Sequence, residues 1–235
     1  MNTAIILAAG SGTRFSSEKP KQFIDILGKP LIVHTLERFD EASTIDSVIL
    51  VLPEVRISEF EKFVEKFEVK KLSCVVAGGA VRAQSVLNGL NAVAPECSVV
   101  AVHDGARPLV KPDEIDSTVS AAASTGAACL VSAVNDTIKS VRAGEILATL
   151  DRSQLRRALT PQAFRVEVLR KAFENAELSE AVTDECYLVE KLGHPIVVVE
   201  GSSSNIKITT QDDLALAEAI MNNRLSIGSA QTSNV

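Results

Sequence analysis

The chain has 235 residues, of which 46% are hydrophobic and 4% aromatic, with no tryptophan, so one large domain with an aliphatic core is expected. Its formal net charge of −6 argues against a nucleic-acid partner, because such a surface usually carries excess positive charge. The apolar run Ala4 to Ala9 is too short to span a membrane and lacks a basic leader. We therefore expect no membrane association and a cytoplasmic location.

Short β-branched runs alternate with longer amphipathic runs along the first half of the chain. The apolar run at 4–9 is the first expected strand, and further strands are expected at 47–52, 72–77, 99–103 and 127–131. Helical periodicity occurs between them, at 31–39, 58–67, 81–93 and 112–124. This alternation predicts an α/β fold with a Rossmann-like, mostly parallel sheet flanked by helices. Ligands are then expected beyond the carboxyl ends of the strands.

A β-hairpin is predicted after Ala133, where the alternation ends. Residues 137–141 and 145–150 flank Arg142-Ala143-Gly144, in which the glycine supplies the turn. An isolated hairpin is only marginally stable, so this arm, at about 136–151, must pack on something. A second subunit is the favoured partner, which predicts a homodimer. An arm folded onto its own domain is the alternative.

The last third of the chain returns to mixed elements. Helices are expected at 166–176, 183–192 and from about 210 to 222, with a strand at 196–200. Residues 226–235 are polar and rich in Gly, Ser and Asn, which is typical of a disordered tail. We therefore predict one domain over residues 1–225, including the arm.

A glycine-rich loop follows the first expected strand. It reads Gly10-Ser11-Gly12-Thr13-Arg14-Phe15 and is followed by Pro20-Lys21-Gln22. Its glycines let backbone N–H groups approach phosphate oxygens, and Arg14 and Lys21 supply positive charge. A dinucleotide fingerprint would need a third glycine where Phe15 stands, and no Walker-type Gly-Lys-Ser/Thr occurs. The loop therefore predicts nucleotide binding of another kind, and its pattern resembles the sugar nucleotidyltransferases.

A second group of polar residues, His103-Asp104-Gly105-Ala106-Arg107-Pro108, stands at the end of the 99–103 strand. Asp104 could hold a substrate hydroxyl or lie near a magnesium ion, and Arg107 could meet a phosphate. Alternatively, Asp104 and Arg107 pair with each other in a loop. His103 is expected to make a structural hydrogen bond. Lys207 lies between apolar neighbours, so its ammonium is expected to point into the crevice.

Further motifs follow in order and make the pattern specific. They are Gly78-Gly79-x-x-Arg82-x-x-Ser85, Asp136-Thr137-Ile138-Lys139, Leu150-Asp151-Arg152, Thr160-Pro161-Gln162, Thr183-Asp184-Glu185 and Asn205-Ile206-Lys207. With the glycine loop and the Asp104 motif, this series resembles the 2-C-methyl-D-erythritol 4-phosphate cytidylyltransferase family, from Ala4 to about Ala219. The resemblance implies an enzyme that makes a cytidine diphosphate derivative from CTP in the non-mevalonate route to isoprenoid precursors.

The resemblance also implies roles for matching residues. The nucleotide would be bound by Ala8, Ala9, Gly10, Gly12, Gly78 and Ser85. The cations that act on the reacting phosphates would be Arg14, Lys21 and Lys207. The second substrate would meet Asp104, Arg107 and Thr160, with Thr137 and Arg152 supplied by the partner's arm. Mg²⁺ or another divalent cation would be held mainly by CTP phosphates, with Asp104 nearby and no direct protein ligand expected.

The chemistry of this reaction needs no general base. A phosphate monoester has a second pKa of about 6 and is already ionised near neutrality. Catalysis is then expected from positioning two anions and stabilising charge on phosphorus.

Two alternative functions remain. One is a ribitol 5-phosphate cytidylyltransferase, which shares the loop and the chemistry, and the other is a catalytically silent nucleotide-binding regulator.

Overall fold

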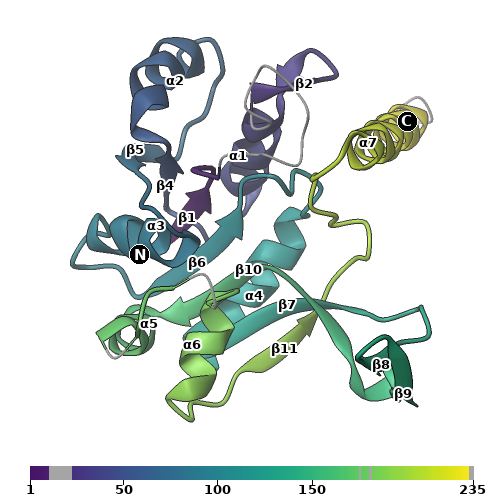
Figure 1. Ribbon diagram of the computed structural model, residues 1–235. Helices are drawn as coiled ribbons and strands as arrows, with labels where there is room; N and C mark the ends of the chain where they lie inside the picture. The colour runs from purple at the N-terminus through teal and green to yellow at the C-terminus, as the bar shows by residue number, and fades with distance from the viewer. Residues whose placement is uncertain (11–22, 175, 180–181, 233–235) are drawn as a thin grey trace.

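A seven-stranded sheet runs through the centre of the protein (Figure 1). The structure, a computed structural model, describes residues 1–10, 23–174, 176–179 and 182–232. The strand order is β11-β7-β10-β6-β1-β4-β5. The strands are β1 (Asn2–Leu7), β4 (Ser47–Leu52), β5 (Leu72–Ala77), β6 (Val99–Asp104), β7 (Ala127–Ala133), β10 (Arg156–Arg165) and β11 (Val197–Glu200).

Most neighbouring strands are parallel, which confirms the predicted fold class. Strand β1 pairs in parallel with β4 and β6, β4 with β5, and β7 with β11. Strand β10 is the exception, because it is antiparallel to both β6 and β7. Strand β10 was not among the strands predicted from the sequence. Its hydrogen-bonding register shifts between Ala158 and Gln162, around Pro161, which cannot donate to the ladder.

Helices cover both faces of the sheet. One core joins Ile6 of β1 to α1 (Leu31–Glu41), α2 (Ile57–Val64) and α4 (Pro112–Thr125). The other joins Ile5 of β1 to α3 (Arg82–Asn91), α5 (Val166–Glu174) and α6 (Glu185–Lys191). Because successive side chains of a strand point to opposite faces, one apolar strand serves both cores.

The predicted hairpin is present and projects from the sheet. Strands β8 (Lys139–Arg142) and β9 (Glu145–Thr149) form a separate two-stranded sheet at the end of the molecule farthest from α3 (Figure 1). Its turn has positive φ angles at both Ala143 (49°) and Gly144 (87°), as tight hairpin turns require. The one-turn helix η3 (Arg152–Gln154) follows the arm.

The C-terminal helix differs from its prediction. Helix α7 (Gln211–Thr232) continues past Asn222, so the predicted disordered tail does not begin at Ser226. Once a helix is nucleated, each added residue forms a backbone hydrogen bond at little cost, and polar composition alone does not end it. No helix in the described part of the chain is both long and apolar enough to cross a membrane. The remaining short elements are β2 (Asp25–Ile26), β3 (Lys29–Pro30) and η2 (Glu54–Arg56).

Candidate active site

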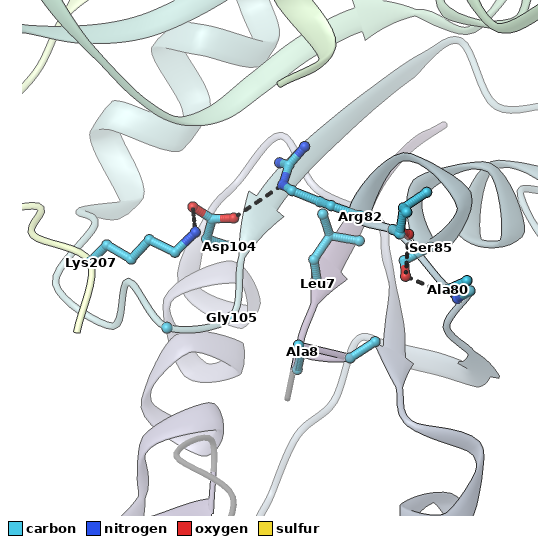
Figure 2. A pocket seen from close by; sticks show the side chains of 13 residues that line it. Leu7, Ala8, Ala80, Arg82, Ser85, Asp104, Gly105 and Lys207 are labelled. Carbon is cyan, nitrogen blue, oxygen red and sulfur yellow. Dashed lines mark hydrogen bonds and ion pairs between the residues drawn. The ribbon is translucent and has the colours of Figure 1, made fainter. Parts of the chain in front are cut away.

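A cavity of about 370 Å³ opens at the carboxyl ends of β1 and β6 (Figure 2). We call it the first cavity. Its walls come from the segment after β1, the loop between β5 and α3, the segment after β6, and Lys207. The lining residues are Leu7, Ala8, Ala9, Gly10, Gly79, Ala80, Val81, Arg82, Ser85, Asp104, Gly105, Ala106 and Lys207. Its position is the one expected for a ligand site in a mostly parallel sheet.

One wall of the first cavity offers backbone and almost no side chain. Ala8, Ala9, Gly10 and Gly79 line it. A Cβ atom on Gly78 would lie 2.3 Å from the Cβ of Ala9 and 3.0 Å from Ser85 Oγ, so only glycine fits there. Ser85 Oγ accepts a hydrogen bond from the Gly79 N–H (3.0 Å) and holds this loop. A flat group such as a nucleoside base can therefore approach the backbone closely.

The opposite wall carries a carboxylate surrounded by cations, which we call the Asp104 cluster: Asp104, Arg82, Arg107 and Lys207. Lys207 Nζ lies 3.0 Å and Arg107 Nε 3.2 Å from Oδ2 of Asp104. Arg82 Nε lies 3.7 Å from Oδ1. Figure 2 shows Arg82 and Lys207 reaching Asp104 from opposite sides. Residues 82, 104 and 207, far apart in the sequence, thus meet at the cavity. The position of Lys207 agrees with the expectation that its ammonium points into the crevice at the strand ends.

The charge of Asp104 is fixed by these neighbours. Burial by itself would raise its pKa, but Lys207, Arg82 and Arg107 outweigh burial and hold the pKa well below the usual value. The side chain of Asp104 is only 10% exposed. Asp104 is therefore an ionised acceptor of hydrogen bonds, not a proton donor.

Arg82 and Glu185 form a second pair of charged residues at the cavity. Both belong to sequence motifs named above, but no role was predicted for either. The guanidinium makes a bidentate contact, with NH1 to Oε1 (2.5 Å) and NH2 to Oε2 (3.0 Å). Burial raises the pKa of Glu185, and Arg82 partly offsets that effect. Burial would lower the pKa of Arg82, but Glu185 and then Asp104 outweigh it and raise that pKa. The pair holds Arg82 at the cavity wall beside Asp104.

Thr160 and Arg107 lie behind Asp104 and support it. Thr160 Oγ1 accepts from the Asp104 N–H (3.1 Å) and donates to Nδ1 of His103 (3.0 Å). The other ring nitrogen of His103 donates to the Arg107 carbonyl (3.1 Å), and Arg107 NH1 donates to the Asn205 carbonyl (2.9 Å). Neither Thr160 nor Arg107 is among the lining residues of the first cavity in this single chain.

His103 is buried and neutral. Burial lowers its pKa to about 4. Because both ring nitrogens are engaged, the expected structural hydrogen bond is confirmed.

Gln162 connects the Thr-Pro-Gln motif to the start of α6. Its Oε1 accepts from the N–H groups of Glu185 (3.1 Å) and Cys186 (3.0 Å). Its Nε2 donates to Asp184 (2.9 Å), which in turn accepts from the Tyr187 N–H as the cap of α6. Gln162 thus fixes the helix turn that carries Glu185.

The remaining predicted site residues lie elsewhere. Thr137 and Arg152 are exposed at the base of the arm, where Arg152 donates to the Asn135 carbonyl. Gly12, Arg14 and Lys21 fall outside the described residues. Within the described part of the chain, no three His, Cys, Asp or Glu side chains gather to hold a metal ion.

Comparison with known proteins places this geometry in a family. Residues 2–223 match the family described as IspD: 2-C-methyl-D-erythritol 4-phosphate cytidylyltransferase. The curated 2-C-methyl-D-erythritol 4-phosphate cytidylyltransferase of Pelotomaculum thermopropionicum is 42% identical over 224 residues, covering 94% of each chain. That of Geobacillus kaustophilus is 41% identical, covering 95% of this chain and 98% of its own.

Solved structures give the same result. The 4-diphosphocytidyl-2C-methyl-D-erythritol synthase of Anaerococcus prevotii superposes with a TM-score of 0.82 at 29% identity, covering 94% of this chain and 96% of its own. The chain belongs to the 2-C-methyl-D-erythritol 4-phosphate cytidylyltransferase family, IspD.

Proposed function

We propose that this protein transfers a cytidylyl group from CTP to 2-C-methyl-D-erythritol 4-phosphate. The products are 4-diphosphocytidyl-2-C-methyl-D-erythritol and pyrophosphate, in the non-mevalonate route to isoprenoid precursors, and we place the reaction in the cytoplasm. The observation that carries the proposal is the Asp104 cluster, which faces a wall of bare backbone across one cavity.

CTP binds on the backbone wall. Ala8, Ala9 and Gly10 contact the nucleoside, and Gly78 leaves room for it. Ala80 and Val81 carry no polar side chain, so cytosine is selected by backbone N–H and C=O groups of this loop. Gly12, Arg14 and Lys21 surround the triphosphate, as the family resemblance implies.

The methylerythritol phosphate binds at the Asp104 cluster. Ionised Asp104 accepts a hydrogen bond from a substrate hydroxyl. Arg107 and Thr160 keep that carboxylate in place, and Lys207, whose side chain is 36% exposed, is available to the substrate phosphate. A substrate phosphate would compete with Asp104 for the Lys207 ammonium. Binding there would hold this phosphate beside the CTP at one edge of the cavity.

The reaction is an in-line attack of the substrate phosphate oxygen on the α-phosphorus of CTP. A new P–O bond forms while the bond to the pyrophosphate oxygen breaks, and pyrophosphate leaves with the electron pair. The attacking phosphate is already an anion, so His103 is not needed as a base, and it remains buried and neutral. Lys207, Arg82, Arg14 and Lys21 stabilise charge that develops on the phosphorus oxygens.

A divalent cation fits this arrangement. Asp104 is the carboxylate lining the cavity among the described residues, and its Oδ1 is the less engaged oxygen, with Arg82 Nε at 3.7 Å. Mg²⁺ is usually held in such sites mainly by substrate phosphates, so CTP phosphates would hold the ion with Asp104 nearby. Bound there, Mg²⁺ would neutralise CTP phosphate charge and favour departure of pyrophosphate.

The arm completes the site across a homodimer. Four apolar side chains of the arm are exposed in one chain: Val141 (58%), Ile146 (66%), Leu147 (57%) and Leu150 (41%). This disfavours an arm folded onto its own domain, and burying such a patch against a second copy would stabilise the dimer. Thr137 and Arg152 would then reach the partner's acceptor phosphate.

The test is magnesium-dependent pyrophosphate release from CTP, with 2-C-methylerythritol 4-phosphate and ribitol 5-phosphate compared under identical conditions. We expect release with the first acceptor and at least about a hundredfold lower kcat/KM with the second, a difference of about 2.7 kcal/mol. Preference for ribitol phosphate would overturn the proposed acceptor. Pyrophosphate release with neither acceptor would overturn the proposed enzymatic activity.

A further inference from the structure

A second cavity, also of about 370 Å³, lies beside the first and is not used by the proposed reaction. The two share one connecting segment, because Gly105 and Ala106 line the first cavity while Pro108 and Leu109 line the second. Its other walls are the β2–β3 turn, α1 and α7, which lie near one another in Figure 1. We call this hollow the second cavity.

Part of the second cavity is apolar and exposed. Leu109 is buried at its floor, while Leu27 and Leu225 are 42% and 66% exposed at its rim. Met221 lines it between them and packs on the small core around Leu109. Leu27 has φ +51°, a left-handed conformation that costs a non-glycine residue roughly 1–2 kcal/mol. The chain keeps an exposed leucine where Asn or Gly would be more stable.

The rest of the wall is cationic. Arg224 is half-buried and donates to the Leu109 carbonyl (3.1 Å) and Ser204 Oγ (3.0 Å). Among the described residues, no carboxylate lies within ion-pair distance of it. Burial lowers the pKa of Arg224, Glu114 opposes that effect, and the nearby positive charge of Arg38 adds to it. A half-buried guanidinium thus lies near a second cation, with Glu114 acting on it from beyond ion-pair distance.

The other charges of the wall leave an excess of positive charge. Arg38 pairs with Glu41 (2.6 Å) and Lys29 with Glu37 (2.6 Å). These two pairs leave Arg224 as the lining cation that, among the described residues, has no ion-pair partner. Guanidinium groups bind phosphate through paired N–H donors, and apolar walls bind hydrocarbon.

We propose that the second cavity binds a small organic phosphate with a short apolar tail. The phosphate lies against Arg224 and Arg38, and the tail covers Leu27, Met221 and Leu225. The site is separate from the proposed reaction and does not depend on it.

The chain offers a direct reporter for this site. It contains two methionines, Met1 and Met221, so ¹³C-methyl labelling of methionine gives one probe in the cavity and one at the N-terminus. The full-length protein is titrated with n-butyl phosphate, inorganic phosphate and n-butanol. We expect a saturable shift of the Met221 methyl signal with n-butyl phosphate, an unmoved Met1 signal, and about tenfold weaker binding of the other two probes. No saturable shift, or equal binding of inorganic phosphate, would overturn the proposal.

Two variants locate the ligand. Arg224→Gln should weaken n-butyl phosphate at least about tenfold, whereas Arg165→Gln should not, although Arg165 also donates to backbone carbonyls. Leu225→Gln, at an exposed position that tolerates substitution, should remove the preference for the butyl group. Unchanged binding in either cavity variant would refute the site.

Binding in the first cavity is the remaining alternative explanation for a shift. Lys207→Ala removes a cation of the first cavity and should leave the Met221 titration unchanged. Loss of the shift in this variant would assign the ligand to the first cavity and overturn the proposal.

Discussion

The Asp104 cluster and the β8–β9 arm differ in how many contacts their side chains make within one chain. Asp104 has three cationic neighbours and a backbone hydrogen bond from its own amide to Thr160. Every residue from 141 to 150 is exposed, including the large apolar side chain of Ile146.

This difference separates two kinds of preparation for catalysis. The groups that we propose to meet charged substrates are held in place before binding, which would avoid reorganisation during the reaction. In the proposed dimer, groups on the arm would gain fixed positions when a second chain covers them. The predictions below test each region against the other, from the largest expected effect to the smallest.

Removing the Lys207 ammonium should have the largest effect. We expect Lys207→Ala to lower kcat about 100- to 1000-fold, as loss of one donor to a developing oxyanion does, with a smaller change in KM for CTP. Steady-state kinetics measure the split. The control is Lys191→Ala, whose ammonium lies over the Tyr187 ring on α6. A variant within threefold of wild-type turnover would exclude Lys207 from the reaction.

His103 should make the free energy of unfolding sensitive to acid. Its pKa is lowered from 6.5 to about 4 on folding, so the unfolded chain binds the proton first and stability is lost as pH falls through this window. The loss should approach about 3 kcal/mol at pH 4. Urea unfolding of His103→Gln should show a shallower pH dependence than wild type, and His194→Gln should not. Parallel curves for all three proteins would contradict the assignment.

Breaking the Arg82–Glu185 pair should cost less. Glu185→Gln keeps the shape but removes the charge beneath Arg82, and we expect a loss of about 1–3 kcal/mol in the free energy of unfolding. Glu190→Gln, on the exposed side of the same helix, is the matched control. Denaturant titration measures the free energy of unfolding of both variants. Equal values would show that the Arg82–Glu185 pair does not stabilise the fold by this amount.

The arm should respond in assembly rather than in folding. Ile146→Asp should convert a dimer to a monomer and lower activity about tenfold, because Thr137 and Arg152 no longer reach the partner's site. The melting temperature of the chain itself should change little, since Ile146 is 66% exposed. Sedimentation velocity measures the change, with Val55→Asp, at an 87% exposed position, as control. A monomeric wild-type protein would contradict the proposal.

Local patterns were enough for much of the fold. The strands at Ser47–Leu52 and Leu72–Ala77 match their predicted ranges, because each is a β-branched run bounded by turn or helix signals. Strand β10 could not be found in this way. Arg156, Arg157 and Pro161 are atypical of a central strand, and the buried Thr160 and Gln162 are tolerated only because their partners lie in distant segments.

The candidate site divides similarly. Asp104 was singled out because it stands at the end of a predicted strand, and Lys207 because it lies between apolar neighbours; both line the first cavity. The pairing of Arg82 with Glu185 joins residues 103 positions apart and depends on how α3 and α6 lie on the same face of the sheet. No local sequence pattern contains that information.

The position of β10 has a consequence for how the protein is made. This strand lies between β6 and β7, yet it follows both in the chain. Until Arg165 has left the ribosome, the facing edges of β6 and β7 carry unpaired backbone groups, which invite pairing with other chains. Thr160 and Lys207 are also synthesised late. A partly translated chain therefore carries the glycine-rich sequence after β1 but not the residues that complete the candidate site, and it is most vulnerable to aggregation in that interval.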